Sequence, residues 1–211
     1  MTPMKIQLAL DFTQLGSAID AARKAAVWVD MIEAGTPLIK ACGMQSVSRL
    51  KEAFPGKKIV ADMKTADVGF LEAGMAASAG ADFMTVMGAA PNACIEESLR
   101  GCRKYGIELL ADTIGVGDVF KRARELKSLG VTNLILHRGI DEAGGCGALL
   151  SCVSRIKRET AMNIWVAGGM NEETALMAKD SGVDVIIVGR HITASGNPSA
   201  AAKALSEKVR G

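Results

Sequence analysis

The chain has 211 residues, of which 49% are hydrophobic and 23% charged, and its formal net charge is +2. This length and composition predict one globular domain over residues 1–211, and nothing in them requires a second. A net charge so close to zero excludes a strong general attraction to nucleic acid or to membrane surfaces, so we expect a small molecule as the partner.

Two features of the sequence predict the cellular compartment. The five cysteines are odd in number and form no C-x-x-C pair, which indicates reduced thiols rather than a disulfide framework or a zinc site. The first residues, MTPMKIQLALDF, contain only a short apolar run, and no run in the chain approaches the roughly 18 apolar residues of a membrane-spanning helix. We therefore expect a cytoplasmic protein that is neither exported nor membrane-spanning.

Short apolar runs rich in β-branched residues alternate with stretches of helical spacing. Eight runs predict strands, in chain order at residues 5–10, 27–33, 57–62, 82–88, 107–112, 132–137, 163–168 and 184–189. Between them, apolar residues three or four apart predict helices, for example at 15–26, 45–54, 118–130 and 171–182. Strands that are apolar on both faces and alternate with helices indicate a parallel sheet covered by helices. Eight such units predict a closed (β/α)8 TIM barrel rather than an open sheet, although about 25 residues per unit is compact for this fold.

Three segments of the chain resemble one another. Residues 78–88, 128–139 and 180–190 each contain a helix end, a glycine and then a predicted strand. The glycines, Gly80, Gly130 and Gly182, suit the left-handed end of a helix that turns back into a strand. The segments lie two units apart, which predicts a barrel built from repeated pairs of units. Convergent use of one kind of turn would explain the similarity equally well.

In a parallel barrel the carboxyl ends of all strands share one rim, and active sites lie there. Asp11, taken alone, is explained equally well as a cap of the next helix. However, five of the eight predicted strands end in a titratable group, and this convergence is harder to explain structurally. In chain order the candidate rim residues are Asp11, Glu33, Asp62 with Lys64, Gly88, Asp112, His137, Gly168 with Gly169, and Gly189 with Arg190.

Glu33 and Asp62 end consecutive predicted strands, which lie about 4.8 Å apart in a parallel sheet. Two carboxylates so close repel each other unless a cation lies between them. Mg²⁺ with oxygen ligands and retained waters would meet this need, and so would Lys64 alone as an ion pair. In a continuing strand Lys64 points to the same face as Asp62, so it can reach a substrate bound to the metal. Asp67 lies at the start of the next helix, where it is either functional or an N-terminal charge or cap.

His137 follows the apolar run NLIL at a strand end. A rim position beside Arg138 is poor for a buried core histidine, so a general acid or base is the sharper interpretation, with a core histidine as the alternative. The other histidine, His191, lies beyond the eighth strand without comparable support, and we interpret it as structural.

The segments VAGGM and VGRHI end the seventh and eighth predicted strands, where barrels of this kind usually bind phosphate. Gly168 and Gly169 allow the backbone to approach an anion closely, so that N–H groups can bind it. Arg190, which follows Gly189, can make a bidentate phosphate contact. A lone Gly-Gly is weak evidence, but the two elements together predict a phosphate site.

The segments ALD, IEAGTPL, ADMKTAD, VAGG and VGR occur in this order along the chain. In this the sequence resembles the orotidine monophosphate decarboxylase superfamily, and within it the branch of 3-hexulose-6-phosphate synthase and 3-keto-L-gulonate-6-phosphate decarboxylase. The resemblance extends over essentially the whole chain. Its most specific part is D-x-K-x-x-D after the third strand.

The resemblance implies a role for each rim residue. It implies that Glu33 and Asp62 bind Mg²⁺ and that Lys64 stabilises and protonates an enediolate. It also implies a homodimer with shared active sites, in which Asp67 reaches into the partner's site. The other implied roles are contact with substrate hydroxyls by Asp11, proton transfer by Asp112 and His137, and phosphate binding by Gly169, Gly189 and Arg190.

Within this branch, Asp112 in LLADTIGV resembles the synthase, whose motif has Asp where the decarboxylase has Glu. Arg138 in HRGID and Arg190 in VGRHI resemble the decarboxylase, but Ile140 stands where that enzyme has a second, functional Arg. Downstream, DEAGGCG departs from the D-x-Q-A-A-G of both groups. The missing Arg at position 140 matters more than the presence of Arg138 and Arg190, because in the family it helps to deliver a proton after decarboxylation.

We therefore expect a carbon–carbon lyase, a 3-hexulose-6-phosphate synthase-like aldolase that adds formaldehyde to D-ribulose 5-phosphate through a 1,2-enediolate, with Mg²⁺. The alternatives are 3-keto-L-gulonate-6-phosphate decarboxylase and another sugar-phosphate lyase of the superfamily. A non-enzymatic barrel that binds a sugar phosphate would keep the phosphate elements but would not need Glu33, Asp62 and Lys64 together.

Overall fold

The strands form the closed barrel that the sequence predicts. The computed structural model describes residues 3–142 and 146–211. Strands β1 to β8 pair in chain order, each parallel to its neighbours, and β8 pairs with β1 to close the sheet. They comprise Lys5–Leu10, Met31–Ala34, Lys58–Thr65, Phe83–Met87, Glu108–Asp112, Asn133–His137, Asn163–Ala167 and Val185–Val188.

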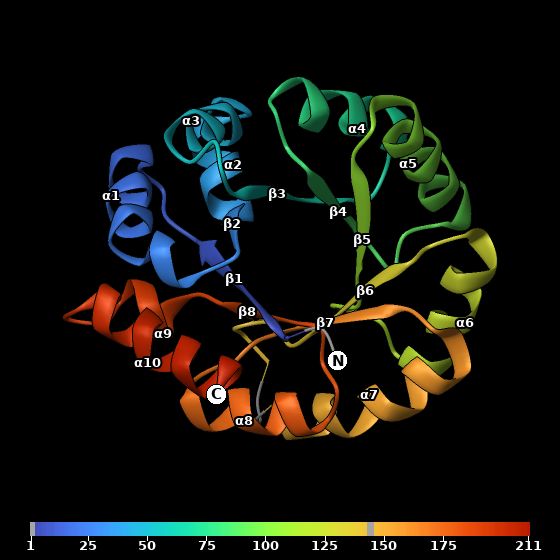
Figure 1. Cartoon of the computed structure of the whole chain (residues 1–211). Helices are drawn as coiled ribbons and strands as arrows, with labels where there is room; N and C mark the ends of the chain where they lie inside the picture. Colours follow the sequence, from blue (N-terminus) through green and yellow to red (C-terminus); the bar gives the residue numbers. More distant parts are fainter. Residues whose placement is uncertain (1–2, 143–145) are drawn as a thin grey trace.

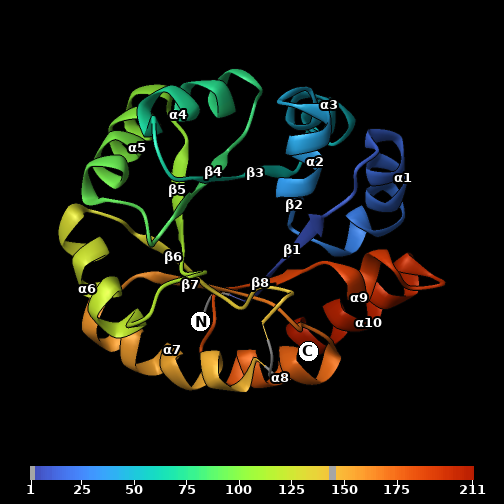
Figure 2. The same cartoon turned by 180° about the vertical axis from the view of Figure 1, so that it is seen from behind.

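Helices surround the barrel, as Figures 1 and 2 show from opposite sides. The (β/α)8 fold is thereby confirmed. Among the residues that the structure describes, no helix combines the length and the apolarity needed to cross a membrane. The helices α1 to α10 comprise Leu15–Ala25, Thr36–Cys42, Gln45–Ala53, Gly69–Ser78, Asn92–Tyr105, Val119–Leu129, Gly147–Thr160, Glu172–Asp180, Arg190–Thr193 and Pro198–Arg210.

One strand begins later than the sequence predicts. In the segment 27–33, β2 starts only at Met31, and the short 3-10 helix η1 (Ala26–Trp28) precedes it. Val27 is exposed to solvent, so the apolar character of this run does not mark burial. The carboxylate of Asp30 accepts a hydrogen bond from the backbone N–H of Ile6 at 2.8 Å, which holds the chain at the amino-terminal edge of the sheet before β2 begins.

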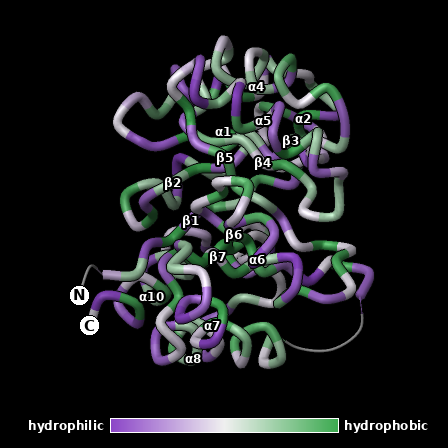
Figure 3. The backbone as a smooth tube through the Cα atoms, turned by 90° about the vertical axis from the view of Figure 1, so that its right-hand side faces the viewer, coloured by the Kyte–Doolittle hydropathy of each residue, from purple (hydrophilic) through white to green (hydrophobic). Residues whose placement is uncertain are grey.

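The interior of the barrel is filled with side chains. Phe83 and Trp165 meet edge to face there, with their ring centroids 6.3 Å apart. Other residues of the strands face the helices, and Figure 3 shows how hydrophobic stretches follow the strands. Because the interior is packed, chemistry is left to the carboxyl-end rim, which is formed by the strand ends and the loops that follow them. The interior residues are Ala9, Met31, Val60, Phe83, Leu110, Ile135, Trp165, Ala167, Val185 and Ile187.

An aspartate precedes three of the even-numbered strands and joins each to the strand before it. Its carboxylate accepts a hydrogen bond from a backbone N–H of that earlier strand and contacts a lysine or an arginine. This recurrence in alternate units agrees with the predicted pairing of units, whatever its origin; Thr132 takes the position before β6. The sets are Asp30 with Ile6 and Arg210, Asp82 with Ile59 and Lys51, and Asp184 with Ile164 and Lys157.

We expect Asp82→Asn to lower the free energy of unfolding at neutral pH by about 1 kcal/mol, because the amide loses the charge of its bonds with Lys51 and Lys58. Burial raises the pKa of Asp82, but the bonds from the two lysines and from Ile59 outweigh burial and lower the pKa. A carboxylate with a lowered pKa contributes stability above its unfolded-state pKa of about 3.9, and this contribution is lost as the pH falls through the folded-state pKa. Urea denaturation should therefore show a difference from wild type that is full at neutral pH and shrinks as the pH falls below about 3.9.

The matched control for this substitution is Asp20→Asn. Asp20 pairs with Arg23 at 3.4 Å, and both side chains are well exposed, so its replacement should change stability little at either pH. A loss for Asp82→Asn that is equal at both pH values would show that the charge of Asp82 is irrelevant.

Candidate active site

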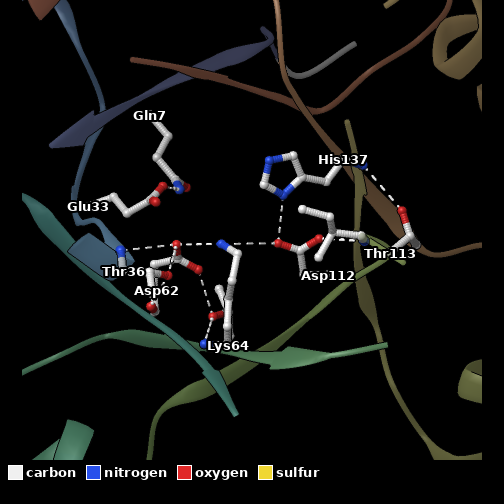
Figure 4. A network of polar contacts seen from close by, with 10 residues as sticks. Gln7, Glu33, Thr36, Asp62, Lys64, Asp112, Thr113 and His137 are labelled. Atoms are coloured by element: carbon white, nitrogen blue, oxygen red, sulfur yellow. Dashed lines mark hydrogen bonds and ion pairs between the residues drawn. The ribbon is translucent and has the colours of Figure 1, made fainter. Parts of the chain in front are cut away.

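Four charged or titratable side chains from three strands form a row at the rim (Figure 4). The Nζ atom of Lys64 lies 2.6 Å from Oδ2 of Asp62 and 3.5 Å from Oδ2 of Asp112. The same oxygen of Asp112 lies 2.7 Å from Nδ1 of His137. The structure therefore brings together three of the predicted catalytic residues and one predicted metal ligand.

The backbone of β3 explains how Asp62 and Lys64 meet, and it differs from the prediction. The pairing of β3 with β4 shifts register between Ala61 and Thr65. Within this bulge Lys64 has φ +47°, a left-handed conformation that is uncommon outside glycine. The strand thus continues past Asp62 to Thr65, as expected, but its pairing with β4 is not regular. Within this irregular stretch the ammonium group of Lys64 lies beside Asp62.

Two threonines that the sequence analysis missed hold the carboxylate of Asp62. The hydroxyl of Thr36 donates to Oδ2 at 2.6 Å, and that of Thr85 donates to Oδ1 at 2.9 Å. Thr36 opens α2 and Thr85 lies inside β4, so neither occupies a strand end, where candidates were sought. The sequence signals were a polar residue within the apolar run FMTVM of β4, for Thr85, and the segment IEAGTPL, which contains Thr36.

Three carboxyl groups gather on the side of the rim formed by β1, β2 and β3. The side-chain amide of Gln7, another residue that the sequence analysis missed, donates to the carboxylate of Glu33. Burial raises the pKa of Glu33 well above its usual value, and the charges of Asp62 and Asp11 raise it further. Burial also raises the pKa of Asp11, with Asp62 adding to the effect. This side of the site therefore favours a bound cation.

Farther along the row, the surroundings of Lys64 and Asp112 favour their charged forms. Burial lowers the pKa of Lys64, but the charges of Asp62 and Asp112 outweigh burial and raise the pKa above its usual value. Burial raises the pKa of Asp112, but the hydrogen bond and charge of His137 and the charge of Lys64 outweigh burial and lower the pKa. At neutral pH Lys64 is therefore an ammonium ion and Asp112 a carboxylate.

The donor set suits a hard divalent cation. Over residues 3–142 and 146–211, no three His, Cys, Asp or Glu side chains are grouped as a metal site. However, Mg²⁺ commonly uses one or two carboxylates and completes its shell with water and substrate. Within the described part of the chain, Oε1 of Glu33 accepts no hydrogen bond and Oδ1 of Asp62 accepts only that from Thr85. Both carboxylates thus keep lone pairs that could bind Mg²⁺.

The two glycines after β7 both have positive φ angles. Gly168 has φ +98° and Gly169 has φ +69°, values that only glycine adopts without strain. A methyl group at Gly168 would overlap the carbonyl oxygen of Arg138 in the loop after β6, whereas a methyl group at Gly169 would meet nothing within 4 Å. Gly168 therefore also serves the contact between two rim loops.

Gly189 and Arg190 lie next to Asp11, because β8 closes the barrel against β1. A methyl group at Gly189 would lie 3.6 Å from Oδ2 of Asp11. Burial dominates the raised pKa of Asp11, and the nearby charge of Arg190 opposes it. Gly189 and Arg190, which are predicted to bind phosphate, thus lie near Asp11, which is predicted to contact substrate hydroxyls. His191, which we interpreted as structural, is half-buried on α9 and joins none of these groups.

Asp67 is not part of the row in this chain. Its side chain is exposed, and within the described residues its carboxylate accepts a hydrogen bond only from the N–H of Val68, at 2.8 Å. Helix α4 begins after Val68, which is its N-cap residue, so the interpretation of Asp67 as a helix cap is wrong. The alternative of a negative charge next to the helix N-terminus stays open, because Asp67 directly precedes Val68.

The small residues of α4 pack against α5 of the same chain. A methyl group at Gly69 would overlap Ser98 and Cys94, and one at Gly101 would crowd Ala73. The small residues on this face of α4 therefore allow α4 and α5 to approach each other closely. The apolar side chains that stay exposed along α4 and its N-cap are Val68, Leu71 and Met75.

Known proteins are similar to this chain in both sequence and fold. The 3-hexulose-6-phosphate synthase of Mycobacterium gastri is 37% identical over 206 residues, which cover 98% of this chain and 100% of the relative. The synthase of Methylomonas aminofaciens is 36% identical over 197 residues, covering 93% and 94%.

Solved structures that are similar to this chain include a protein of the same name as these relatives. A crystal structure of 3-hexulose-6-phosphate synthase, 36% identical, has a TM-score of 0.91 and covers 98% of this chain and 100% of its own. A crystal structure of KGPDC from Streptococcus mutans, 30% identical, has a TM-score of 0.89, with coverage of 98% and 97%. The family described as Orotidine 5'-phosphate decarboxylase / HUMPS matches residues 4–205. The family match and the closed barrel agree, and the chain therefore belongs to this family of enzymes.

Proposed function

We propose that the protein is a 3-hexulose-6-phosphate synthase-like lyase that adds formaldehyde to D-ribulose 5-phosphate through a 1,2-enediolate, with Mg²⁺ bound. The observation that carries the proposal is the row of Asp62, Lys64, Asp112 and His137, because it sets a permanent cation beside a histidine held by a carboxylate. Relatives at 32–37% identity that are named as this synthase support the substrate and the reaction.

In the proposed reaction, His137 removes a proton from C1 of the ketose. The ionised carboxylate of Asp112 lies 2.7 Å from Nδ1, so a neutral imidazole keeps its own proton on Nδ1 and presents Nε2 as the base. Figure 4 shows this second ring nitrogen on the side of the ring away from Asp112. Asp112 is then the group that orients the base and stabilises its protonated form.

Lys64 stabilises the negative charge that develops on the substrate oxygens as the proton leaves. Its ammonium group is already fixed between Asp62 and Asp112, so little reorganisation is needed when the charge appears. The C1 carbanion of the enediolate then attacks the carbon of formaldehyde and forms the new carbon–carbon bond. The resulting alkoxide takes the proton held on Nε2 of His137, which returns the histidine to its starting state.

The remaining rim residues bind and orient the substrate in this proposal. Glu33 and Asp62 would hold Mg²⁺, which when bound supplies positive charge that polarises substrate oxygens. Asp11 contacts sugar hydroxyls. Phosphate is bound by Arg190 and by backbone N–H groups in the two loops that contain Gly168, Gly169 and Gly189.

The second candidate is decarboxylation of 3-keto-L-gulonate 6-phosphate. Arg190 favours it, as does the structure of 3-keto-L-gulonate-6-phosphate decarboxylase from Vibrio cholerae O1 biovar El Tor, which is 30% identical with a TM-score of 0.86. Ile140 opposes it, because an uncharged side chain, 69% exposed, stands where the decarboxylase has an Arg that helps to deliver a proton. Of the divergent stretch DEAGGCG, residues 143–145 lie outside the described part of the chain.

A direct assay separates the candidates. The purified protein with Mg²⁺ is given D-ribulose 5-phosphate and formaldehyde, and separately 3-keto-L-gulonate 6-phosphate, and product is followed in each case. We expect a larger kcat/KM for the formaldehyde reaction, and we expect thorough chelation to abolish it and added Mg²⁺ to restore it. Efficient decarboxylation without any formaldehyde-dependent product would reject the synthase. Activity unchanged by chelation would reject the metal and leave Lys64 alone to balance the carboxylates.

The expected compartment is part of the same proposal. All five cysteines are free thiols in the structure, which fits the reducing environment of the cytoplasm.

We further propose a homodimer with shared active sites. Asp67 has no partner in the row of its own chain, yet it lies just beyond the strand that carries Lys64. Beside it the exposed apolar side chains of Val68, Leu71 and Met75 offer a surface that a second copy could cover. In this proposal Asp67 reaches into the partner's site, as the family resemblance implies, and this would account for a carboxylate that lies outside the row of its own chain.

Subunit complementation tests this arrangement. Lys64→Ala and Asp67→Ala should each be nearly inactive as homodimers. In a heterodimer of the two variants, one of the two sites would combine an intact Lys64 with an intact Asp67, so about half the wild-type activity per dimer should return. The measurement needs purified heterodimers carrying two different tags. Heterodimers that stay inactive would show that each site is made from one chain.

A further inference from the structure

We propose that Thr85 is a positioning residue, whose hydroxyl group sets the conformation of Lys64 and the orientation of Asp62. The inference rests on the proposed function for its catalytic consequence. Its structural part concerns the β3 bulge alone and can be tested without any substrate.

The bulge leaves Thr85 facing three residues of the neighbouring strand. Ala61 pairs with Met84 and Thr65 pairs with Val86, so residues 62–64 of β3 lie opposite Thr85 alone. Regular ladder hydrogen bonds are interrupted over such a stretch, and its backbone groups need other partners. A side chain at position 85 is the group best placed to supply them.

The hydroxyl of Thr85 acts as a hydrogen-bond acceptor and as a donor at the same time. Its Oγ1 accepts a hydrogen bond from the backbone N–H of Lys64 at 2.8 Å and lies 2.9 Å from Oδ1 of Asp62. The hydroxyl accepts from the backbone N–H of Lys64 and uses its own proton to donate to Oδ1 of Asp62. The residue is 1% exposed, so water cannot easily replace either bond.

These two bonds hold a conformation that Lys64 would not adopt unaided. Its φ of +47° lies in the left-handed region, which is unfavourable for a residue with a Cβ and persists only where the surroundings enforce it. If the hydroxyl of Thr85 is removed, the N–H of Lys64 loses its acceptor and Oδ1 of Asp62 loses its donor. Lys64 is then free to return to an extended conformation, which would move Nζ away from its position 2.6 Å from Asp62.

Thr36 cannot compensate for this loss. It donates to the other carboxylate oxygen, Oδ2, and makes no hydrogen bond to the backbone of Lys64 among the described residues. Asp62 is thus held from both sides, whereas the backbone of Lys64 depends on Thr85.

The test compares Thr85→Val, which keeps the branched shape without the hydroxyl, with Thr85→Ser, which keeps the hydroxyl. We expect Thr85→Val to lower kcat for the formaldehyde reaction roughly 10- to 100-fold, with KM for ribulose 5-phosphate changed less than about threefold. Thr85→Ser should stay within about threefold of wild type. Crystal structures should show Lys64 out of the left-handed region in the valine variant and within it in the serine variant.

Thr160→Val is the matched control. Thr160 is also a buried threonine, its hydroxyl donates to the carbonyl of Ile156 at 2.7 Å, and it lies at the end of α7, outside the active site. Its replacement should lower the melting temperature and leave kcat per folded protein unchanged.

Two results would overturn the proposal: a valine variant whose Lys64 keeps φ near +47° and its contact with Asp62, or one whose kcat per folded protein falls no more than that of the Thr160 control. If wild type proves inactive with ribulose 5-phosphate and formaldehyde, the proposed function fails. The crystallographic comparison then still decides whether Thr85 positions Lys64.

Discussion

Lys64→Ala should lower kcat/KM for the formaldehyde reaction about a thousandfold, which corresponds to about 4 kcal/mol of lost transition-state stabilisation. The ammonium group is the one cation fixed within the row of rim residues, between Asp62 and Asp112. It meets charge that exists only as the proton leaves C1, so its loss should appear mainly in kcat. Steady-state kinetics with Mg²⁺ at saturation would measure the effect.

Exchange of the C1 proton of ribulose 5-phosphate with deuterated water, without formaldehyde, isolates the first step of the same reaction. It should fall as far as the full reaction in Lys64→Ala, because both depend on the stabilised enediolate. Lys58→Ala is the matched control, since Lys58 lies at the other end of β3, is exposed and pairs with Asp82. It should leave both rates unchanged. A Lys64→Ala enzyme that still exchanges the proton at the wild-type rate would remove Lys64 from enediolate formation.

Gly168→Ala should lower the free energy of unfolding by about 3 kcal/mol and weaken phosphate binding. The substitution places a Cβ at φ +98°, which costs about 1–2 kcal/mol, and overlaps the carbonyl oxygen of Arg138, which adds a similar penalty of overpacking. Relief of the overlap requires the loops after β6 and β7 to separate. KM for the sugar phosphate should therefore rise about tenfold, a change worth about 1.4 kcal/mol. Urea denaturation and initial-rate kinetics measure the two effects.

Gly169→Ala is the control for backbone strain alone. Gly169 also has a positive φ, of +69°, but an added methyl group would meet nothing within 4 Å. Its loss of stability should be limited to about 1 kcal/mol. Equal losses for the two variants would show that the overlap with the carbonyl oxygen of Arg138 adds no penalty.

The sequence by itself determined the architecture and most of the candidate site. Strands buried on both faces must be apolar along their length, so the alternation with helices was visible without any structure. A parallel barrel collects its strand ends at one rim, so Glu33, Asp62, Asp112 and His137 could be selected from their positions alone. The strand predicted over residues 27–33 was too long because this prediction, too, rested on apolar composition. Composition cannot tell the apolar but exposed Val27 from a buried residue.

Only the tertiary structure decided how the selected residues are held. The sequence analysis did not select Gln7, Thr36 and Thr85, because they lie inside strands or at the start of a helix rather than at strand ends. Their importance depends on which carboxylate each one contacts on a neighbouring strand. The left-handed Lys64 arises from a register shift between β3 and β4 that no local pattern signals. Hydrogen bonds between strands depend on register, and register is a property of two segments far apart in the chain. Residue type and position therefore predicted the chemistry of the rim, while the relation between strands decided its geometry.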